Sequence, residues 1–531
     1  MPKNNENKLG RYFNLPNPGL VSYFDIVRRG QPEIYRTNFA GKDKDVSQVL
    51  QEWKPSLETL SDRWPTLVEF ENDLASKVGP MSVMKPLRDR MKDIDSYYAF
   101  VTSEAEPIDN RALLSVLSEW GSGRGIQPRN QRLTVERMRK STNSGSPYFA
   151  KRRLVTAKTI PCTVEQWGNS TIQRLPNRNW EACAVLGWRG QEGGPSPDDV
   201  KQRVVWMFPY AVNVAELQVY QIIIEVAQRF NVVPAWVSMD AVDERVTRLF
   251  DTKADDDLII CTDFSSFDQH FGPKCQEAAE TILRGLLSNT ESARIWLKDV
   301  FPIKYRIPLM YDIGKFRTGI HGMGSGSGGT NCDETLVHRA LQYEAAQAHN
   351  QRLNPNSQCL GDDGIISYPG ITADDVMRSY TRHGLEMNAD KQYVSTQDCV
   401  YLRRWHHKDY RIDGICRGVY STFRALGRLC EQERYYDPEI WSAKMVALRQ
   451  LSIIENVRWH PLREDFAEFC MKRDRYRLGI DIPGFLDNIE AIAQESMELM
   501  PDFLGYTKTM QSDGKHLGIS QWWIVNYLKS K

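Results

Sequence analysis

Residues 258–268 read Leu-Ile-Ile-Cys-Thr-Asp-Phe-Ser-Ser-Phe-Asp, and this stretch decides the fold. Its first part, 258–262, is a short continuous apolar run, which is typical of a strand buried on both faces. Asp263 follows directly at the end of that strand. Taken alone, Asp263 is equally compatible with an ordinary strand–loop–helix unit in which an acid caps the helix.

A second pair of acids lies in Gly361-Asp-Asp-Gly364, between Cys359-Leu360 and Ile365-Ile366. Apolar residues on both sides of a short turn predict a hairpin with two acids at its tip. Asp and Gly also favour plain polar turns, so the tripeptide by itself is weak evidence. If the hairpin neighbours the first strand in one sheet, Asp263, Asp362 and Asp363 share a rim.

Three carboxylates on one rim suit metal-dependent phosphoryl transfer. That chemistry asks a protein mainly to position substrates and to neutralise charge on phosphate oxygens. Two Mg²⁺ ions, hard cations that prefer oxygen ligands, can do so when several carboxylates converge. Adjacent acids at a turn repel each other without a counterion, so a bound cation also explains their presence.

Two helices are predicted around these strands. One opens at Pro273, with apolar rows that include Ala278, Ile282 and Leu286. The other follows the glycine-rich loop 322–329 and begins near Thr330 or Asn331. Strands that carry acids at their ends, alternating with helices, predict an α+β protein.

Composition sets wider limits. A chain of 531 residues is expected to form several subdomains, and its 68 basic residues balance 68 acidic ones. Ten cysteines without a CxxC pair favour free thiols in a reducing compartment. The polar start is no secretory signal, and no apolar run of about 18 residues could span a bilayer. We therefore expect a cytosolic or particle-enclosed protein without a membrane partner.

Seven segments, in this order, resemble the motifs of viral RNA-dependent RNA polymerases. They match the template-entry segment, the basic fingers strand, the first and second palm motifs, the signature turn, the segment ending in lysine and the primer-grip strand. The likeness is greatest to picobirnavirus polymerases in the runs 263–269 and 325–331. The seven segments are 142–147, 201–204, 263–268, 325–330, 361–363, 383–391 and 401–404.

The resemblance implies a right-hand polymerase with fingers, a palm built on an antiparallel sheet and a helical thumb. Residues 1–125 would form an N-terminal extension that bridges fingers and thumb, and 126–250 the fingers. Residues 251–412 would form the palm, with a fingers insertion near 275–320. Residues 413–531 would form the thumb and a C-terminal tail, whose apolar part 522–527 could dock onto the body or reach the product channel.

The resemblance also implies the metal site and the chemistry. Asp263 and Asp362 would be the principal ligands of two Mg²⁺ or Mn²⁺ ions, with Asp363 a weaker contributor. The backbone carbonyl of Phe264 would reach a metal as well. Lys391 would protonate pyrophosphate as it leaves, a general-acid contribution of about 10²–10⁴ in rate.

Nucleotide and RNA contacts follow from the same resemblance. The nucleoside triphosphate would be bound by Lys201, Arg203, Arg189, Asp268, Ser325, Thr330 and Asn331. RNA would be contacted by Thr142, Ser144, Gly145, Pro147, Gly326, Arg403 and Arg404. The basic stretch 137–164, which has no Asp or Glu, fits such a surface, although a solvated face is the plainer interpretation.

Asp268 bears on the choice of sugar. It can accept a hydrogen bond from a ribose 2′-OH, where reverse transcriptases carry a bulky aromatic residue. The family usually has Asn four residues after the motif threonine, but Glu334 stands there. Either Asn331 or Glu334 is the partner of Asp268. The alternative interpretation of Asp268 is an acid at a helix N-terminus.

The resulting hypothesis is an RNA-directed RNA polymerase that transcribes and replicates a segmented double-stranded RNA genome. Its partners would be RNA template and product, nucleoside triphosphates and a capsid protein, and it would act as a monomer inside the virion and in the host cytoplasm. Competing hypotheses are a palm polymerase that makes DNA and a non-catalytic RNA-binding or capsid protein. The sequence leaves open whether synthesis starts with a primer.

Overall fold

The computed structural model describes residues 8–499 and 518–531. The chain divides into two compact units. Unit 1 comprises Met1–Gly30, Pro86–Trp188 and Val204–Tyr401, and unit 2 comprises Gln31–Lys85, Arg189–Arg203 and Leu402–Lys531. The N-terminal 125 residues thus contribute to both units, while their role as a bridge stays a prediction, as do the boundaries of fingers, palm and thumb.

A four-stranded antiparallel sheet forms the centre of unit 1. Its strands, in spatial order, are β11 (Gln358–Leu360), β12 (Asp363–Ile366), β7 (Ile259–Thr262) and β14 (Tyr393–Ser395). Every residue of β7 is buried, since β7 lies between β12 and β14 in the sheet and also contacts β15 (Asp398–Tyr401). The predicted buried strand, the hairpin and the α+β class are therefore confirmed.

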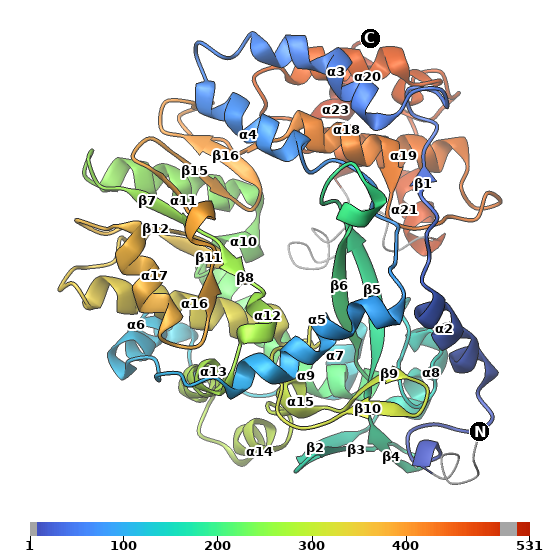
Figure 1. Ribbon diagram of the computed structural model, residues 1–531, viewed down its shortest axis with the longest axis vertical. Helices are drawn as coiled ribbons and strands as arrows, with labels where there is room; N and C mark the ends of the chain where they lie inside the picture. The colour runs from blue at the N-terminus through green and yellow to red at the C-terminus, as the bar shows by residue number, and fades with distance from the viewer. Residues whose placement is uncertain (1–7, 500–517) are drawn as a thin grey trace. The chain divides into compact units, whose positions relative to one another are not determined.

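Helix α16 (Thr330–Gln347) is the main support of this sheet (Figure 1). It packs against β11 and against three helices, α6 (Asn110–Trp120), α13 (Pro273–Leu286) and α17 (Ala373–Thr381). Leu336, Val337, Ala340 and Leu341 are all buried, as the apolar pattern predicted. The predicted helix after Pro273 is confirmed as α13, whose Ala278, Ile282 and Leu286 are buried.

Unit 1 contains further strands and helices around this centre. β5 (Ala184–Gln191) pairs in parallel with β9 (Leu309–Asp312), which pairs with β10 (Lys315–Arg317). A separate sheet consists of β2 (Thr163–Trp167), β3 (Ser170–Arg174) and β4 (Asn179–Ala182). The other helices include α2 (Pro18–Arg29), α5 (Leu87–Ala99), α7 (Gln131–Glu136), α8 (Arg152–Thr159), α9 (Tyr210–Phe230), α10 (Pro234–Val237), α11 (Met239–Thr252), α12 (Phe267–His270), α14 (Glu291–Asp299) and α15 (Ile303–Arg306).

Unit 2 is mostly helical, as predicted for the C-terminal part of the chain. Its core is shared by α3 (Val46–Glu58) with α18 (Thr422–Cys430), α19 (Ala443–Glu455), α20 (Arg463–Arg473), α21 (Ile489–Leu499) and α23 (Trp523–Lys529). In α23, Ile524, Val525 and Leu528 are buried, and the Glu455 carboxylate accepts the backbone N–H groups of Trp523 and Ile524. The apolar C-terminal stretch therefore docks within this unit.

The N-terminal segment is anchored to α18 by a buried acid. Glu71, in α4 (Pro65–Ala75), is fully buried. It accepts hydrogen bonds from the backbone N–H groups of Thr422 and Phe423, which belong to the first turn of α18. These donors have no partner within their own helix, so Glu71 both satisfies them and complements the helix dipole.

A short ribbon in unit 2 yields a prediction about stability. Strand β1 (Tyr35–Arg36) pairs with β18 (Glu431–Gln432), and the Glu431 side chain is only 3 % exposed. Burial raises the pKa of Glu431 to about 7, although Arg36 lies 3.6 Å away and opposes the shift. The unfolded chain loses this proton at lower pH than the folded one, so stability falls as pH rises from about 4.5 to 7.

Glu431→Gln should remove the loss of stability that accompanies the rise in pH. At pH 8 we expect the free energy of unfolding of the variant to exceed that of the wild type by on the order of 1–3 kcal/mol, with a smaller difference at pH 5. Denaturant unfolding at the two pH values measures this. The assignment would be contradicted if the wild type gained stability relative to the variant between pH 5 and pH 8.

Candidate active site

The register of β7 and β12 brings the predicted acids together. Thr262 pairs with Gly364, and the Thr262 hydroxyl donates to the Gly364 carbonyl at 3.3 Å. Continuing this register by one residue sets Asp263 opposite Asp363, on strands whose usual separation is about 4.8 Å. Asp362 precedes Asp363 and is exposed at the turn. The predicted pairing of the first strand with the hairpin is confirmed, while the use of the three acids as a metal site stays a prediction.

The turn that carries Asp362 is a two-residue hairpin loop. Leu360 pairs with Asp363, so Gly361 and Asp362 form the loop. Gly361 has a φ of 57°, which is the conformation that hairpin turns of this length require and that glycine adopts without strain. The sequence Gly-Asp-Asp therefore has a structural reason for its first residue as well as for its acids.

Asp263 is held in place by Asn388, which lies within the segment ending in Lys391, and by Gln392, which follows that segment. The Asn388 amide donates to Asp263 Oδ2 at 2.8 Å. Gln392 binds the backbone of Asp263 on both sides, because its Oε1 accepts from the Asp263 N–H at 3.1 Å and its Nε2 donates to the Asp263 carbonyl at 2.8 Å. Both side chains fix the acid at the point where β7 ends.

The partner of Asp268 is Glu334. The two side chains share a hydrogen bond, and Glu334 is 6 % exposed. Burial first, and then the neighbouring Asp268 carboxyl, raise the pKa of Glu334 well above its usual value. Asn331 accepts the Trp236 indole N–H on its Oδ1 at 2.8 Å, and its Nδ2 lies beside Gly361, near Glu334.

The glycine-rich loop is fixed by side chains of α9 and by its own hydroxyls. Ser325 Oγ donates to the Val204 carbonyl at 2.9 Å, and Thr330 Oγ1 donates to the Gly324 carbonyl at 3.2 Å. Gly326 is exposed, and its carbonyl accepts from the Asn213 amide at 3.2 Å. As placed, Ser325 and Thr330 support the loop conformation, and their predicted contacts with a nucleotide stay predictions.

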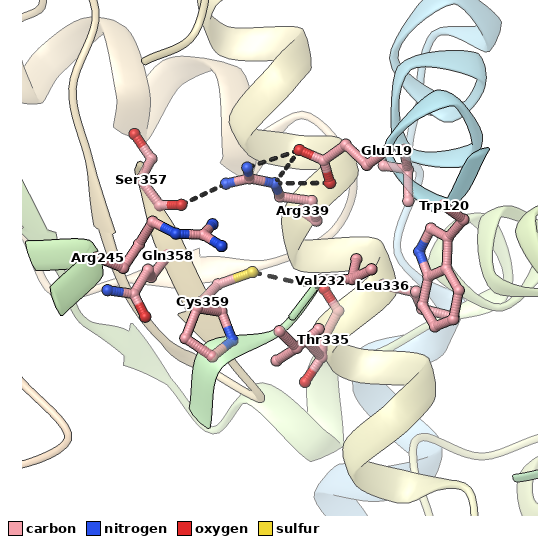
Figure 2. A pocket seen from close by; sticks show the side chains of 13 residues that line it. Glu119, Trp120, Val232, Arg245, Thr335, Leu336, Arg339, Ser357, Gln358 and Cys359 are labelled. Carbon is pink, nitrogen blue, oxygen red and sulfur yellow. Dashed lines mark hydrogen bonds and ion pairs between the residues drawn. The ribbon is translucent and has the colours of Figure 1, made fainter. Parts of the chain in front are cut away.

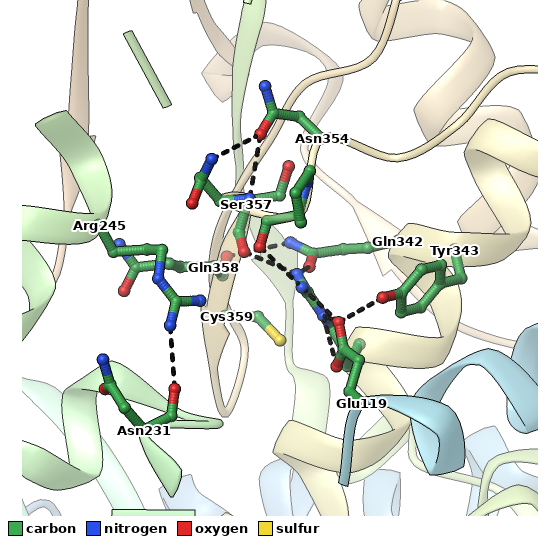
Figure 3. A network of polar contacts seen from close by, with 12 residues as sticks. Glu119, Asn231, Arg245, Gln342, Tyr343, Asn354, Ser357, Gln358 and Cys359 are labelled. Atoms are coloured by element: carbon green, nitrogen blue, oxygen red, sulfur yellow. Dashed lines mark hydrogen bonds and ion pairs between the residues drawn. The ribbon is translucent and has the colours of Figure 1, made fainter. Parts of the chain in front are cut away.

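A polar network lies behind the hairpin, on the side of β11 that faces α6 (Figures 2 and 3). We call Glu119, Arg339, Gln342 and the backbone of Ser357 the rear network. Arg339 donates to both Glu119 oxygens and to the Ser357 carbonyl, and Gln342 donates to the Gln358 carbonyl at 3.0 Å. The cavity beside it measures about 20 Å³, room for roughly one water molecule. The rear network is thus a brace for β11.

The basic residues predicted to bind triphosphate lie in unit 2. Arg203 donates to Gln191 at 2.9 Å, Arg189 forms an ion pair with Glu433 at 2.9 Å, and Lys201 is exposed in β6 (Lys201–Met207). These contacts are on exposed side chains and are readily exchanged for an anion. Their predicted role in nucleotide binding stays a prediction.

Glu192 gathers three further arginines in unit 2. Arg424 lies 3.2 Å from its carboxylate, Arg403 3.8 Å and Arg428 3.9 Å. Burial opposes the charge, but Arg428 and Arg424 together lower the pKa of Glu192. Burial and the neighbouring Arg424 lower the pKa of Arg403 to about 10. More positive than negative charge is collected here, which favours a phosphate partner.

Several predicted RNA contacts are buried instead. Arg404 is 8 % exposed and donates to the Gly418 carbonyl at 3.1 Å, so it stabilises a loop rather than facing RNA. Arg403 occupies a left-handed turn position, with φ of 57°, between β15 (Asp398–Tyr401) and β16 (Arg404–His407). The resemblance placed both arginines in the primer-grip strand, whereas Arg403 lies in the turn before β16 and Arg404 is its first residue.

The template-entry segment is also packed inward. Ser144, Gly145 and Pro147 are buried, and Ser144 exchanges backbone and hydroxyl hydrogen bonds with Ala150. Thr142 is half-buried. In this conformation the three buried residues present little surface, and their predicted contacts with RNA stay predictions.

Lys391 and Phe264 complete the predicted set. Lys391 is exposed in the short helix Ala389–Lys391, between Asn388 and Gln392, the two residues that hold Asp263. The Phe264 ring is buried, stacks on Tyr380 at 5.8 Å and meets His338 edge-on at 5.3 Å. Protonation of pyrophosphate by Lys391 and metal binding by the Phe264 carbonyl both stay predictions.

The donor chemistry of the rim fits a hard divalent cation, since all three side chains are carboxylates. Across residues 8–499 and 518–531, however, no three acidic, histidine or cysteine side chains are gathered tightly enough to hold a metal ion. The backbones of the two strands are in register, but the three carboxylates are not gathered around one point. A cation would have to draw them together by side-chain rotation.

Comparison with known proteins agrees with this geometry. Residues 197–420 match the family model described as viral RNA-dependent RNA polymerase. The chain is 60% identical over 530 residues to a potential RNA-dependent RNA polymerase of a human picobirnavirus (strain Human/Thailand/Hy005102/-), covering 99% of both chains.

Solved structures agree as well. One is the crystal structure of the RNA-dependent RNA polymerase of a human picobirnavirus, with TM-score 0.94, 60% identity and 99% of each chain covered. Another is that of its insertion-loop deletion mutant, with TM-score 0.93, 58% identity and the same coverage. The predicted right-hand polymerase fold and the predicted family are confirmed.

Asn388, Gln392, Thr335 and His338 were missed by the sequence reasoning. Asn388 lies within the recognised segment 383–391 and Gln392 directly follows it, so both could have been suspected as polar residues near Lys391. Thr335 and His338 lie on the buried face of α16, where the sequence pattern does not distinguish them from ordinary core residues.

The support of Asp263 by Gln392 can be tested. Gln392→Leu keeps the size of the side chain but removes the hydrogen bonds to both sides of the acid. We expect catalytic activity to fall by about 10-fold or more, a usual effect for residues that orient metal ligands. The matched control is Gln397→Leu. Gln397 is exposed and follows β14, the strand that Gln392 precedes. Equal activity of the two variants would refute the assignment.

Proposed function

This chain belongs to the viral RNA-dependent RNA polymerases, and we propose that it copies an RNA template by adding ribonucleoside monophosphates in the 5′ to 3′ direction. The observation that carries this proposal is the register of β7 and β12, which sets Asp263 opposite Asp363 and leaves Asp362 exposed at the turn. A purely structural protein has no need for three acids at one strand end.

The proposal includes two Mg²⁺ or Mn²⁺ ions held by Asp263 and Asp362, with Asp363 contributing and the Phe264 carbonyl within reach. When bound, such ions lower the charge on phosphate oxygens and favour displacement of pyrophosphate. The chain's own residues do the rest. Asn388 and Gln392 orient Asp263, and the hairpin turn presents Asp362.

Sugar selection falls to Asp268 in this proposal. Glu334 lies beside Asp268, and the Asp268 carboxylate would accept a hydrogen bond from a ribose 2′-OH. Lys391 would donate a proton to pyrophosphate. Lys201, Arg203 and Arg189 would bind the triphosphate, and Arg403 would contact RNA phosphates, all being cations on exposed or partly exposed side chains.

The biological setting belongs to the proposal as well. A polymerase of this length, so similar to a picobirnavirus protein, suits the transcription and replication of a segmented double-stranded RNA genome. We further propose that it works as a monomer beside capsid protein, in the virion interior and the host cytoplasm. Among the described residues, no helix is both long and apolar enough to cross a membrane.

The decisive experiment measures incorporation of labelled ribonucleotides on a single-stranded RNA template with Mg²⁺ or Mn²⁺. We expect the wild type to extend RNA and Asp362→Ala to show none, because it removes a metal ligand. Asp374→Ala, which removes an exposed acid of α17, should behave as the wild type. The absence of incorporation by the wild type on every template would overturn the proposal.

A second experiment tests the sugar assignment. Asp268→Ala removes the acceptor for the 2′-OH, so the preference for ribonucleotides over deoxyribonucleotides should fall by about 10-fold or more. The measured quantity is the ratio of kcat/KM values for the two nucleotides. An unchanged ratio in the variant would show that Asp268 does not read the sugar.

A further inference from the structure

Helix α16 holds the acidic turn by its backbone, at the residue that precedes Asp362. The Gly361 N–H donates to Thr335 Oγ1 at 2.9 Å, and the Gly361 carbonyl accepts from His338 Nδ1 at 2.8 Å. Thr335 and His338 are three residues apart and so lie on one face of the helix. Both hydrogen-bonding groups of Gly361 are therefore bound by a single rigid element.

The identity of the donor follows from chemistry. A carbonyl can only accept, so His338 carries its proton on Nδ1. The other ring nitrogen, Nε2, is buried without a hydrogen-bond partner. Burial lowers the pKa of His338 to about 4, in agreement with a neutral ring. The histidine therefore makes one ring hydrogen bond, from Nδ1 to the carbonyl of Gly361 in the turn.

The ring is fixed by close packing. His338 is fully buried and meets Phe264 edge-on at 5.3 Å and Tyr380 edge-on at 6.0 Å. It also lies directly against Gly364, where a Cβ atom would come within 2.7 Å of the ring. The hairpin therefore has a glycine on each side of its two acids, one for the turn and one for the histidine.

The helix itself cannot shift easily against the hairpin. In the rear network, Arg339 donates hydrogen bonds to Glu119 of α6 and to the Ser357 carbonyl (Figure 2). Gln342 donates to carbonyls of both hairpin strands, Gln358 at 3.0 Å and Ile365 at 3.2 Å. Residues 335–342 thus bind the hairpin at its turn and along its length.

We propose that His338, together with Thr335, is a positioning residue of the polymerase: its Nδ1–H fixes the Gly361 carbonyl and so sets where Asp362 meets a metal ion. This inference rests on the proposed function, because it assigns Asp362 to metal binding. A histidine that served only the core would need neither a fixed tautomer nor a glycine opposite its ring.

The test replaces the ring by amides that place a donor differently. Asparagine puts an N–H near the position of Nδ1, and glutamine puts one near Nε2. We expect His338→Gln to raise the Mn²⁺ concentration for half-maximal binding, measured by direct titration, by about 10-fold or more, and to lower kcat by a similar factor. His338→Asn should stay within about threefold of the wild type.

Hydrogen exchange gives a readout that is independent of metal and of activity. The Gly361 amide should exchange faster in His338→Gln than in the wild type or in His338→Asn, because the turn is released on one side. His349→Gln changes a partly exposed histidine just beyond α16 and serves as the matched control. Wild-type Mn²⁺ binding and exchange in His338→Gln, even with a lower melting temperature, would overturn the proposal.

Two further outcomes are decisive. If His338→Asn behaves as His338→Gln, the Nδ1 donor is not what matters and the proposal fails. If His338→Gln does not fold, Thr335→Val and Thr335→Ser take its place, and only the valine variant should lose Mn²⁺ affinity. Failure of the wild type to incorporate ribonucleotides would instead overturn the proposed function. The hydrogen-exchange measurement would still show whether His338 fixes the turn at Gly361.

Discussion

Pairing between β7 and β12 is the constraint on which the rest of the site depends. Thr262 and Gly364 are the last residues to pair, and the acids follow where the ladder ends. Because side chains alternate along a strand, a slip of one residue would turn Asp263 and Asp363 to opposite faces. The buried apolar residues of the two strands set this register, so the core determines the position of the charges.

Helix α16 contacts several parts of the active site and holds them in place relative to this register. Its N-terminal end follows the glycine-rich loop, Glu334 contacts Asp268, and Thr335 and His338 bind the turn. One turn further on, Arg339 and Gln342 brace the hairpin from behind. Sugar selection, metal binding and the loop thus depend on one helix, and a shift of that helix would disturb all three together.

Much of this could be predicted from the sequence because the signals were local. A buried strand that ends in Asp263, a glycine at the start of the acidic turn and the apolar rows of α13 are each readable within ten or so residues. The family resemblance then supplied the order of the segments and the right-hand fold.

What could not be predicted depended on contacts between distant parts of the chain. The contact between Asp268 and Glu334 joins two segments that are far apart in sequence, so neither segment alone reveals it. Arg404 looked exposed because its burial depends on Gly418 and the turn before it. The N-terminal segment carried no motif, since its role in unit 2 consists of packing and of the single buried acid Glu71.

The most direct test of the central claim is crystallographic. Crystals grown with Mn²⁺ should show, in anomalous maps, two ions about 3.5–4 Å apart, bound by Asp263 and Asp362 across the end of the β7–β12 pair. Finding no ion at this rim in crystals of a protein that incorporates nucleotides, or finding ions held by other acids, would contradict the account.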